Sequence, residues 1–152
     1  MPFGPAERLR LRQLLRQFRA AHNVASLPGG AGKALEAWML MSMAKSASHE
    51  GWAVRLHRGD GQPLPSGQAF AFRDQPGKIK QSDPVAVGFV ALTSPKSQSV
   101  SFELHGGVQW RGRSGARHEC DVSLLPANVG VALRATAGGG YPRGLPIVLL
   151  EC

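Results

Sequence analysis

The sequence predicts an α+β fold, an α/β-sandwich-like arrangement in which a helix packs on a mixed central β-sheet. Two observations lead to this expectation. A long, strongly helical segment lies in the first third of the chain, and several short segments with strand composition follow it, most of them separated by turns that contain Gly or Pro. At 152 residues the chain has the length of one domain with a substantial core.

The first predicted element is a basic N-terminal helix over residues 6–21, which a Gly/Pro linker follows up to residue 32. Apolar side chains at positions i, i+3, i+4 and i+7 form one stripe of this helix, and arginines form the adjoining stripe: Arg8, Arg12, Arg16 and Arg19. The arginines suit a phosphate backbone or an anionic lipid surface, whereas the apolar stripe suits a surface helix docked on the rest of the protein.

A second unit is predicted from residue 33 to residue 152, and it opens with a helix over residues 33–49. Apolar residues lie nearly all round this helix, which favours burial, and Gly51 follows its end. Glu36 shares a row with Leu40 and Met43, so its side chain is expected to point toward protein. The alternative for Glu36 is a first-turn acid that the helix dipole favours.

Strands are then predicted over residues 52–57, 69–72, 85–92, 100–105, 118–125 and 147–151. Residues 126–146 are Gly/Pro-rich and are expected to connect the last two. Simple alternation would place Cys120, Val122 and Leu124 on one face of the fifth strand and Glu119, Asp121, Ser123 and Leu125 on the other. The last segment, "IVLLE", is an aliphatic run typical of a strand buried on both faces.

The chain is strongly basic, with 18 Lys+Arg against 10 Asp+Glu, a net charge of +8 and a pI near 10.5. Such a charge favours a polyanion, DNA above all, although an acidic protein partner would also suit it. No apolar run approaches the length of a membrane span and no signal peptide precedes the helix, so we expect no membrane partner and a cytoplasmic location. Two cysteines also suit a reducing compartment.

Three carboxylates stand in apolar surroundings: Glu36 in the helix, Asp121 inside a strand and Glu151 at the end of the last strand. Carboxylates held in such places are costly unless a positive charge meets them. Hard oxygen ligands suit Mg²⁺ or Mn²⁺, which orient phosphodiesters and acidify water. The sequence therefore predicts a metal site made of these three residues.

The stretches "GRSGARHECDVSLL" and "PIVLLE", together with the helix "KALEAWMLMSMAKSASH", resemble the PD-(D/E)xK nucleases of the restriction-endonuclease-like superfamily. The resemblance spans about residues 33–152. It implies a restriction-endonuclease-like core and a Mg²⁺-dependent deoxyribonuclease of a defence or DNA-repair system. It also implies that Asp121 and Glu151 are catalytic metal ligands and that Glu36 is an auxiliary ligand.

One part of the motif is absent, because Cys152 follows Glu151 and no lysine of E-x-K comes after it. The last helix and strand of the superfamily's core are missing as well. We therefore expect a chain truncated just before the lysine, inactive or impaired as given, with further domains of a longer parent chain or a homo-oligomer covering the sheet. The alternative is a non-catalytic nucleic-acid-binding or assembly module on the same fold.

Three further residues lie close to the acids in the sequence. Ser114 and Arg117 are candidates for contact with the DNA backbone, and His118 is a candidate for contact with a phosphate or for tuning a neighbouring pKa. A zinc site is disfavoured, because the histidines and cysteines of this region form no CxxC or HxxxH pair.

Overall fold

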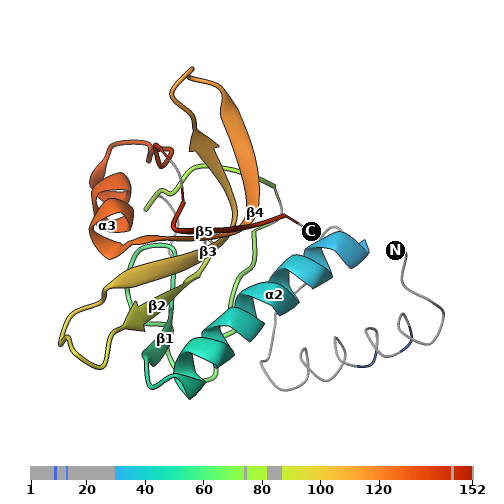
Figure 1. The fold of residues 1–152 in the computed structure, drawn as a ribbon, viewed down its shortest axis with the longest axis vertical. Helices are drawn as coiled ribbons and strands as arrows, with labels where there is room; N and C mark the ends of the chain where they lie inside the picture. Colours follow the sequence, from blue (N-terminus) through green and yellow to red (C-terminus); the bar gives the residue numbers. More distant parts are fainter. Residues whose placement is uncertain are drawn as a thin grey trace.

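The computed structural model describes residues 9, 13, 30–73, 75–81, 87–144 and 146–151. The predicted stripe of Arg8, Arg12, Arg16 and Arg19 lies outside these residues. Within them the chain forms one five-stranded sheet with two helices, an α+β fold (Figure 1). Its elements are α2 (Gly30–His49), β1 (Ala53–His57), β2 (Phe89–Thr93), β3 (Phe102–Arg111), β4 (Arg117–Pro126), α3 (Ala127–Ala135) and β5 (Val148–Leu150).

The strands follow one another across the sheet in the order β1-β2-β3-β4-β5, and each named pair is antiparallel. The prediction of a mixed sheet was therefore wrong. Connections of fewer than ten residues join β2 to β3 and β3 to β4, whereas a parallel neighbour would need a crossover of about a dozen residues or more. Parallel pairing occurs in the described residues as isolated bridges, Gly77↔Val108 and Arg111↔Arg143.

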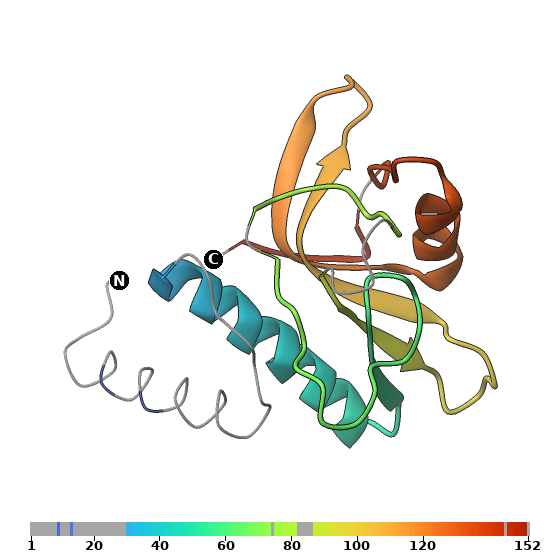
Figure 2. The same ribbon diagram turned by 180° about the vertical axis from the view of Figure 1, so that it is seen from behind.

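Helix α2 lies along one face of the sheet (Figures 1 and 2). It begins at Gly30, three residues before the predicted start, and is rich in Ala, Met and Leu, which are strong helix formers. Its buried residues recur at i, i+3, i+4 and i+7: Ala37, Leu40, Met41 and Ala44. Leu40, Met41 and Ala44 join Val90, Leu104 and Val122 of the sheet in the main core. In the described residues no helix is long and apolar enough to cross a membrane.

Helix α3 packs on the opposite face, against β3 and β4 (Figure 1). It occupies part of residues 126–146, which were expected to form a connection without regular structure. Its Val129 and Leu133 pack on a second apolar cluster, made of Ile79, Val108, Trp110, Cys120 and Leu125. The sheet therefore lies between the two helices, with one apolar core on its α2 side and a separate one on its α3 side.

Strand β4 does not keep one alternation along its length, so the predicted division of its faces holds for Val122, Leu124 and Leu125 but was wrong for Cys120. Val122 and Leu124 pack in the main core, whereas Cys120 and Leu125 belong to the second cluster. The change occurs at Asp121, which lies between the paired positions Gly106↔Val122 and Val108↔Cys120 of one continuous β3–β4 register. Gly107 lies between these pairs with φ 58°, a left-handed conformation that glycine adopts without strain. Beyond this point, toward the β3–β4 turn, Val108 and Cys120 therefore face the second cluster.

Two other strand predictions need correction. Residues 69–72 form no strand, although Phe70 is buried in the main core. The aliphatic run of β5 predicted a strand buried on both faces, and this was wrong. Leu149 is 42% exposed, and Ile147, just before the strand, is 53% exposed. In the described sheet β5 is an edge strand, with β4 as its neighbour.

Candidate functional site

The pairing of β4 with β5 brings the two predicted acids of these strands together. Val122 pairs with Leu150, so Asp121 and Glu151 occupy the next position on each strand. Residues directly opposite in an antiparallel pair have Cβ atoms about 5 Å apart. The end of β5 also lies beside the first turn of α2 in both views (Figures 1 and 2). Glu151 is exposed and Asp121 is half-buried.

The first turns of α2 supply the third predicted acid and a lysine. The ammonium of Lys33 donates a hydrogen bond to Oε2 of Glu36 over 2.7 Å, and it lies 3.8 Å from Oε1 of Glu119 on β4. The side chains of Lys33 and Glu36 are 16% and 13% exposed. Glu36 thus points toward protein, as its position in the helix predicted. Lys33 therefore contacts two carboxylates, and Asp121 and Glu151 lie near them on β4 and at the end of β5. We call Glu36, Glu119, Asp121 and Glu151 the acid cluster.

The electrostatics link the members of the acid cluster. Burial raises the pKa of Glu36, and the charges of Asp121 and Glu119 raise it further, while Lys33 acts in the opposite direction. Burial also raises the pKa of the Cys120 thiol to about 11, with added effects from Glu151, Asp121 and Glu119. Asp121 and Glu119 therefore lie within electrostatic reach of Glu36, and the charges of Glu151, Asp121 and Glu119 all reach Cys120.

The donor set of the acid cluster suits a hard divalent cation, because it consists of carboxylate oxygens with like charges held close together. Within the described residues, however, no three His, Cys, Asp or Glu side chains converge closely enough to enclose a metal ion. Lys33 now supplies the positive charge that Glu36 requires. A cation would be held by Asp121, Glu151 and Glu36 once Lys33 moved away from Glu36.

The three residues predicted near the acids lie on or beside the β3–β4 turn. Ser114 is exposed in the turn, Arg117 begins β4, and His118 pairs with Trp110 across the hairpin. The guanidinium of Arg117 donates a hydrogen bond to the hydroxyl of Tyr141 over 3.0 Å. These residues lie toward the hairpin end of β4, whereas Asp121 lies further along the strand.

Sequence reasoning missed Lys33 and Glu119 as members of the site. A signal for Glu119 was present, since alternation put it on the same face as Asp121. Lys33 lies three residues before Glu36, a spacing that makes helical neighbours, and this was the available signal for it. No family model, curated protein or solved structure matches the chain.

A second polar group, which the sequence did not predict, lies between α3 and the sheet. Glu103 on β3 is 2% exposed, and both of its oxygens accept hydrogen bonds from Arg134 of α3. Nε2 of His105 lies 2.9 Å from Oε2 of Glu103. Since a carboxylate only accepts hydrogen bonds, Nε2 carries the proton and donates it. We call Glu103, His105 and Arg134 the buried triad.

Ser123 lies directly across from His105 in the sheet register, so a serine, a histidine and a carboxylate occur side by side. This order of residues is the one that nucleophilic hydrolases use. Here, however, Ser123 is 0% exposed, and among the described residues its hydroxyl has no hydrogen-bond partner. A substrate has no route to this hydroxyl, and we assign the buried triad to the attachment of α3.

Proposed function

We propose that this chain is a metal-dependent DNA endonuclease domain, built on a restriction-endonuclease-like core, that hydrolyses phosphodiester bonds. The observation that carries the proposal is the register of β4 and β5. In this register Asp121 of β4 lies opposite Glu151, which directly follows β5, and Asp121 is also close enough to Glu36 of α2 to affect its pKa. These are the three acids that the resemblance implied as metal ligands, and Glu36 is 85 residues from Asp121 in the sequence.

Asp121 and Glu151 would hold Mg²⁺ or Mn²⁺ directly, and Glu36 would complete or orient the ligand set. The cation would withdraw charge from a phosphodiester and acidify a water molecule. Burial raises the pKa of Glu36, which would favour a role for it in proton transfer. Lys33 would offer its ammonium to a phosphate oxygen after it releases Glu36.

One observation favours the second candidate, a non-catalytic nucleic-acid-binding or assembly module. Lys33 already neutralises part of the acid cluster through Glu36 and Glu119, so the cluster has a purely structural explanation. In that case the acids hold α2 on the end of β4. Metal binding separates the two candidates, because the module requires no cation.

The test is titration of the purified chain with Mn²⁺, followed by electron paramagnetic resonance of the free ion. We expect saturable binding that Asp121→Asn weakens by about tenfold or more, because loss of one ligand charge removes a main attraction. Glu50→Gln is the matched control, since Glu50 is an exposed acid just after α2. Absence of saturable binding in the unaltered chain would exclude the nuclease proposal.

Nicking of supercoiled plasmid DNA in Mg²⁺ is the second measurement. Asp121→Asn should abolish whatever nicking the unaltered chain shows, with an unchanged melting temperature. Equal nicking by Asp121→Asn and the unaltered chain would show that the activity belongs to another site or to a contaminant.

A further inference from the structure

The turn between β3 and β4 carries a group of exposed cations. Arg111 ends β3, Arg113 lies in the turn and Arg117 begins β4. Arg143 joins them from a distant part of the chain, because it forms a bridge with Arg111, whose N–H donates to the carbonyl of Pro142 over 2.8 Å. The turn is closed by Gly115, whose φ of 84° suits a tight reversal. The hairpin extends beyond both helices (Figures 1 and 2).

Tyr141 connects this group to a fifth cation. The guanidinium of Arg117 and the ammonium of Lys78 each lie 5.5 Å from the centroid of the Tyr141 ring. Arg117 also donates its hydrogen bond to the Tyr141 hydroxyl. Two cations therefore share one aromatic ring. We call the set the hairpin surface: Lys78, Arg111, Arg113, Arg117, Tyr141 and Arg143.

The cations of the hairpin surface have no acidic partners among the described residues. Every ion pair of the described chain lies elsewhere, at Lys33, Arg58, His105 and Arg134. Five like charges placed together repel one another unless an anion comes between them. The hairpin surface is thus a site of uncompensated positive charge, and the β3–β4 pairing and the Arg111↔Arg143 bridge hold its backbone in place.

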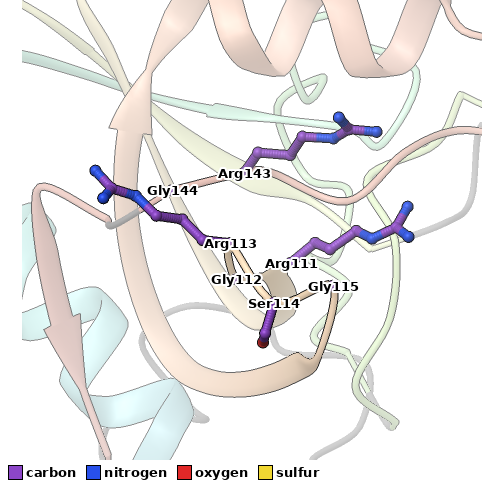
Figure 3. A pocket seen from close by; sticks show the side chains of 7 residues that line it. All are labelled: Arg111, Gly112, Arg113, Ser114, Gly115, Arg143 and Gly144. Atoms are coloured by element: carbon purple, nitrogen blue, oxygen red, sulfur yellow. The ribbon is translucent and has the colours of Figure 1, made fainter.

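The shape of the hairpin surface suits a long anion better than a small one. A hollow of about 490 Å³ lies between Arg111, Arg113 and Arg143, and a second of about 350 Å³ lies between Arg111, Arg117 and Tyr141. Figure 3 shows that Arg111 and Arg143 extend to one side of the turn and Arg113 to the other. The guanidinium groups do not converge on one point, so they match a row of phosphates rather than a single free phosphate.

We propose that the hairpin surface binds the phosphate backbone of DNA and leads it toward the acid cluster. This deepens the proposed function and rests on it for the direction of the bound strand. Four residues of β4 separate Arg117 from Asp121, a distance of about 13 Å along a strand. At 3.4 Å per base pair, the backbone held at Arg117 passes the acid cluster about four base pairs away.

The test compares two triple variants in equilibrium binding of a fluorescein-labelled 20-base-pair duplex. The hairpin variant carries Arg111→Gln, Arg113→Gln and Arg143→Gln. The control carries Lys45→Gln, Arg55→Gln and Lys96→Gln, which remove the same charge from exposed positions on α2, β1 and the β2–β3 turn. Anisotropy is recorded between 50 and 200 mM salt in EDTA, so that no cation-dependent cleavage occurs.

The hairpin variant should bind about tenfold or more weakly at the lowest salt. The slope of the logarithm of its binding constant against the logarithm of the salt concentration should be less steep than that of the unaltered chain by about 2 to 3, because each lost phosphate contact removes about 0.9 from the slope. The control should keep the slope of the unaltered chain. An equal loss in both variants, or an unchanged slope in the hairpin variant, would overturn the proposal.

Failure of this inference is separate from failure of the proposed function. Asp121→Asn should bind the duplex at least as tightly as the unaltered chain, because it removes a negative charge next to the path of the DNA. If the triple hairpin variant misfolds, the single variant Arg113→Gln serves instead, with an expected loss of about 0.9 in slope. An unchanged slope for a folded Arg113→Gln would exclude that residue as a phosphate contact and overturn the path drawn through it.

Discussion

Glu103 is a carboxylate placed where water cannot reach it. Burial alone would raise its pKa, but the hydrogen bonds from Arg134 and His105 outweigh burial and hold the pKa below its ordinary value. Arg134 also lies 4.4 Å from the centroid of the Phe89 ring, which stacks on His105. Each charged or polar member of the buried triad therefore has a partner on more than one side, and these contacts offset the desolvation cost of its burial.

Glu103→Gln tests this interdependence. The change leaves the Arg134 guanidinium buried without a counter-charge, and loss of one partner of a buried pair costs about 3–5 kcal/mol. Urea unfolding followed by circular dichroism should show this loss in the free energy of unfolding. Glu50→Gln, at an exposed acid, should change it by less than about 0.5 kcal/mol. Similar midpoints for both variants would mean that Arg134 reaches water or another partner.

At the residue scale, sequence reasoning singled out acids that interrupt an apolar pattern and missed Glu103, whose partner is distant in the sequence. Asp121 and Glu36 were predictable because each interrupts an apolar pattern. Glu103 also stands within a strand pattern, "VSFELH", but its counter-charge is 31 residues away in a helix that the sequence did not predict. Such a pair forms only when the chain folds, so the sequence around Glu103 does not indicate it.

At the element scale, α3 depends on the sheet more than on its own sequence. It has nine residues, begins after Pro126 and contains Gly130, so its intrinsic helix stability is low. Arg134 and the apolar contacts of Val129 and Leu133 hold it in place. Gly130 lies against the Glu103 carboxylate, where a Cβ atom would overlap the Glu103 oxygens. The close approach of helix and strand requires a glycine there.

Gly130→Ala should therefore destabilise the protein, although alanine favours helices. We expect a loss of about 1–3 kcal/mol, because the added methyl group must push α3 or Glu103 aside. Gly32→Ala is the matched control in α2, where a Cβ meets nothing within 4 Å. It should stabilise the protein by about 0.5–1 kcal/mol, to be measured by thermal unfolding. Stabilisation by both changes would show that α3 has room at Gly130.

The same dependence explains which elements the sequence could predict. Helix α2 and strands β1 to β5 carry patterns set by their own side chains, and each was predicted, although β2 begins four residues after its predicted start and β3 ends six residues after its predicted end. Helix α3 was missed because Pro126, Asn128 and Gly130 are typical of loops. Residues 69–72 were wrongly predicted as a strand, because a buried Phe70 gives the same apolar signal in an irregular segment.

At the scale of the whole molecule, acid pH should act first through His105. Burial lowers the pKa of His105 below 6.5, with Arg134 and Arg73 adding to the effect against Glu103. The folded protein therefore keeps this histidine neutral at a pH where the unfolded chain binds a proton. Stability is fully present above pH 6.5 and falls as the pH decreases from there toward the folded pKa. Glu103 extends the loss below pH 4.5, whereas the raised pKa of Glu36 opposes it.

Thermal unfolding between pH 8 and pH 5 measures this effect. The free energy of unfolding should fall below pH 6.5 with a slope of up to about 1.4 kcal/mol per pH unit for the one proton bound. His105→Gln should flatten that slope even if it lowers stability overall. His118→Gln, at an exposed histidine, should leave the slope unchanged. A slope that survives His105→Gln would assign the proton to a different group.

Lys33 gives the acid cluster a property that its carboxylates alone would not have. Since its ammonium already bonds to Glu36, entry of the proposed divalent cation would be an ion exchange, in which the lysine charge leaves as the metal charge arrives. The net gain is then one charge rather than two. Metal affinity should consequently be modest, and selective for ions whose charge density exceeds that of an ammonium group. The lysine would act as a built-in competitor that keeps monovalent ions out.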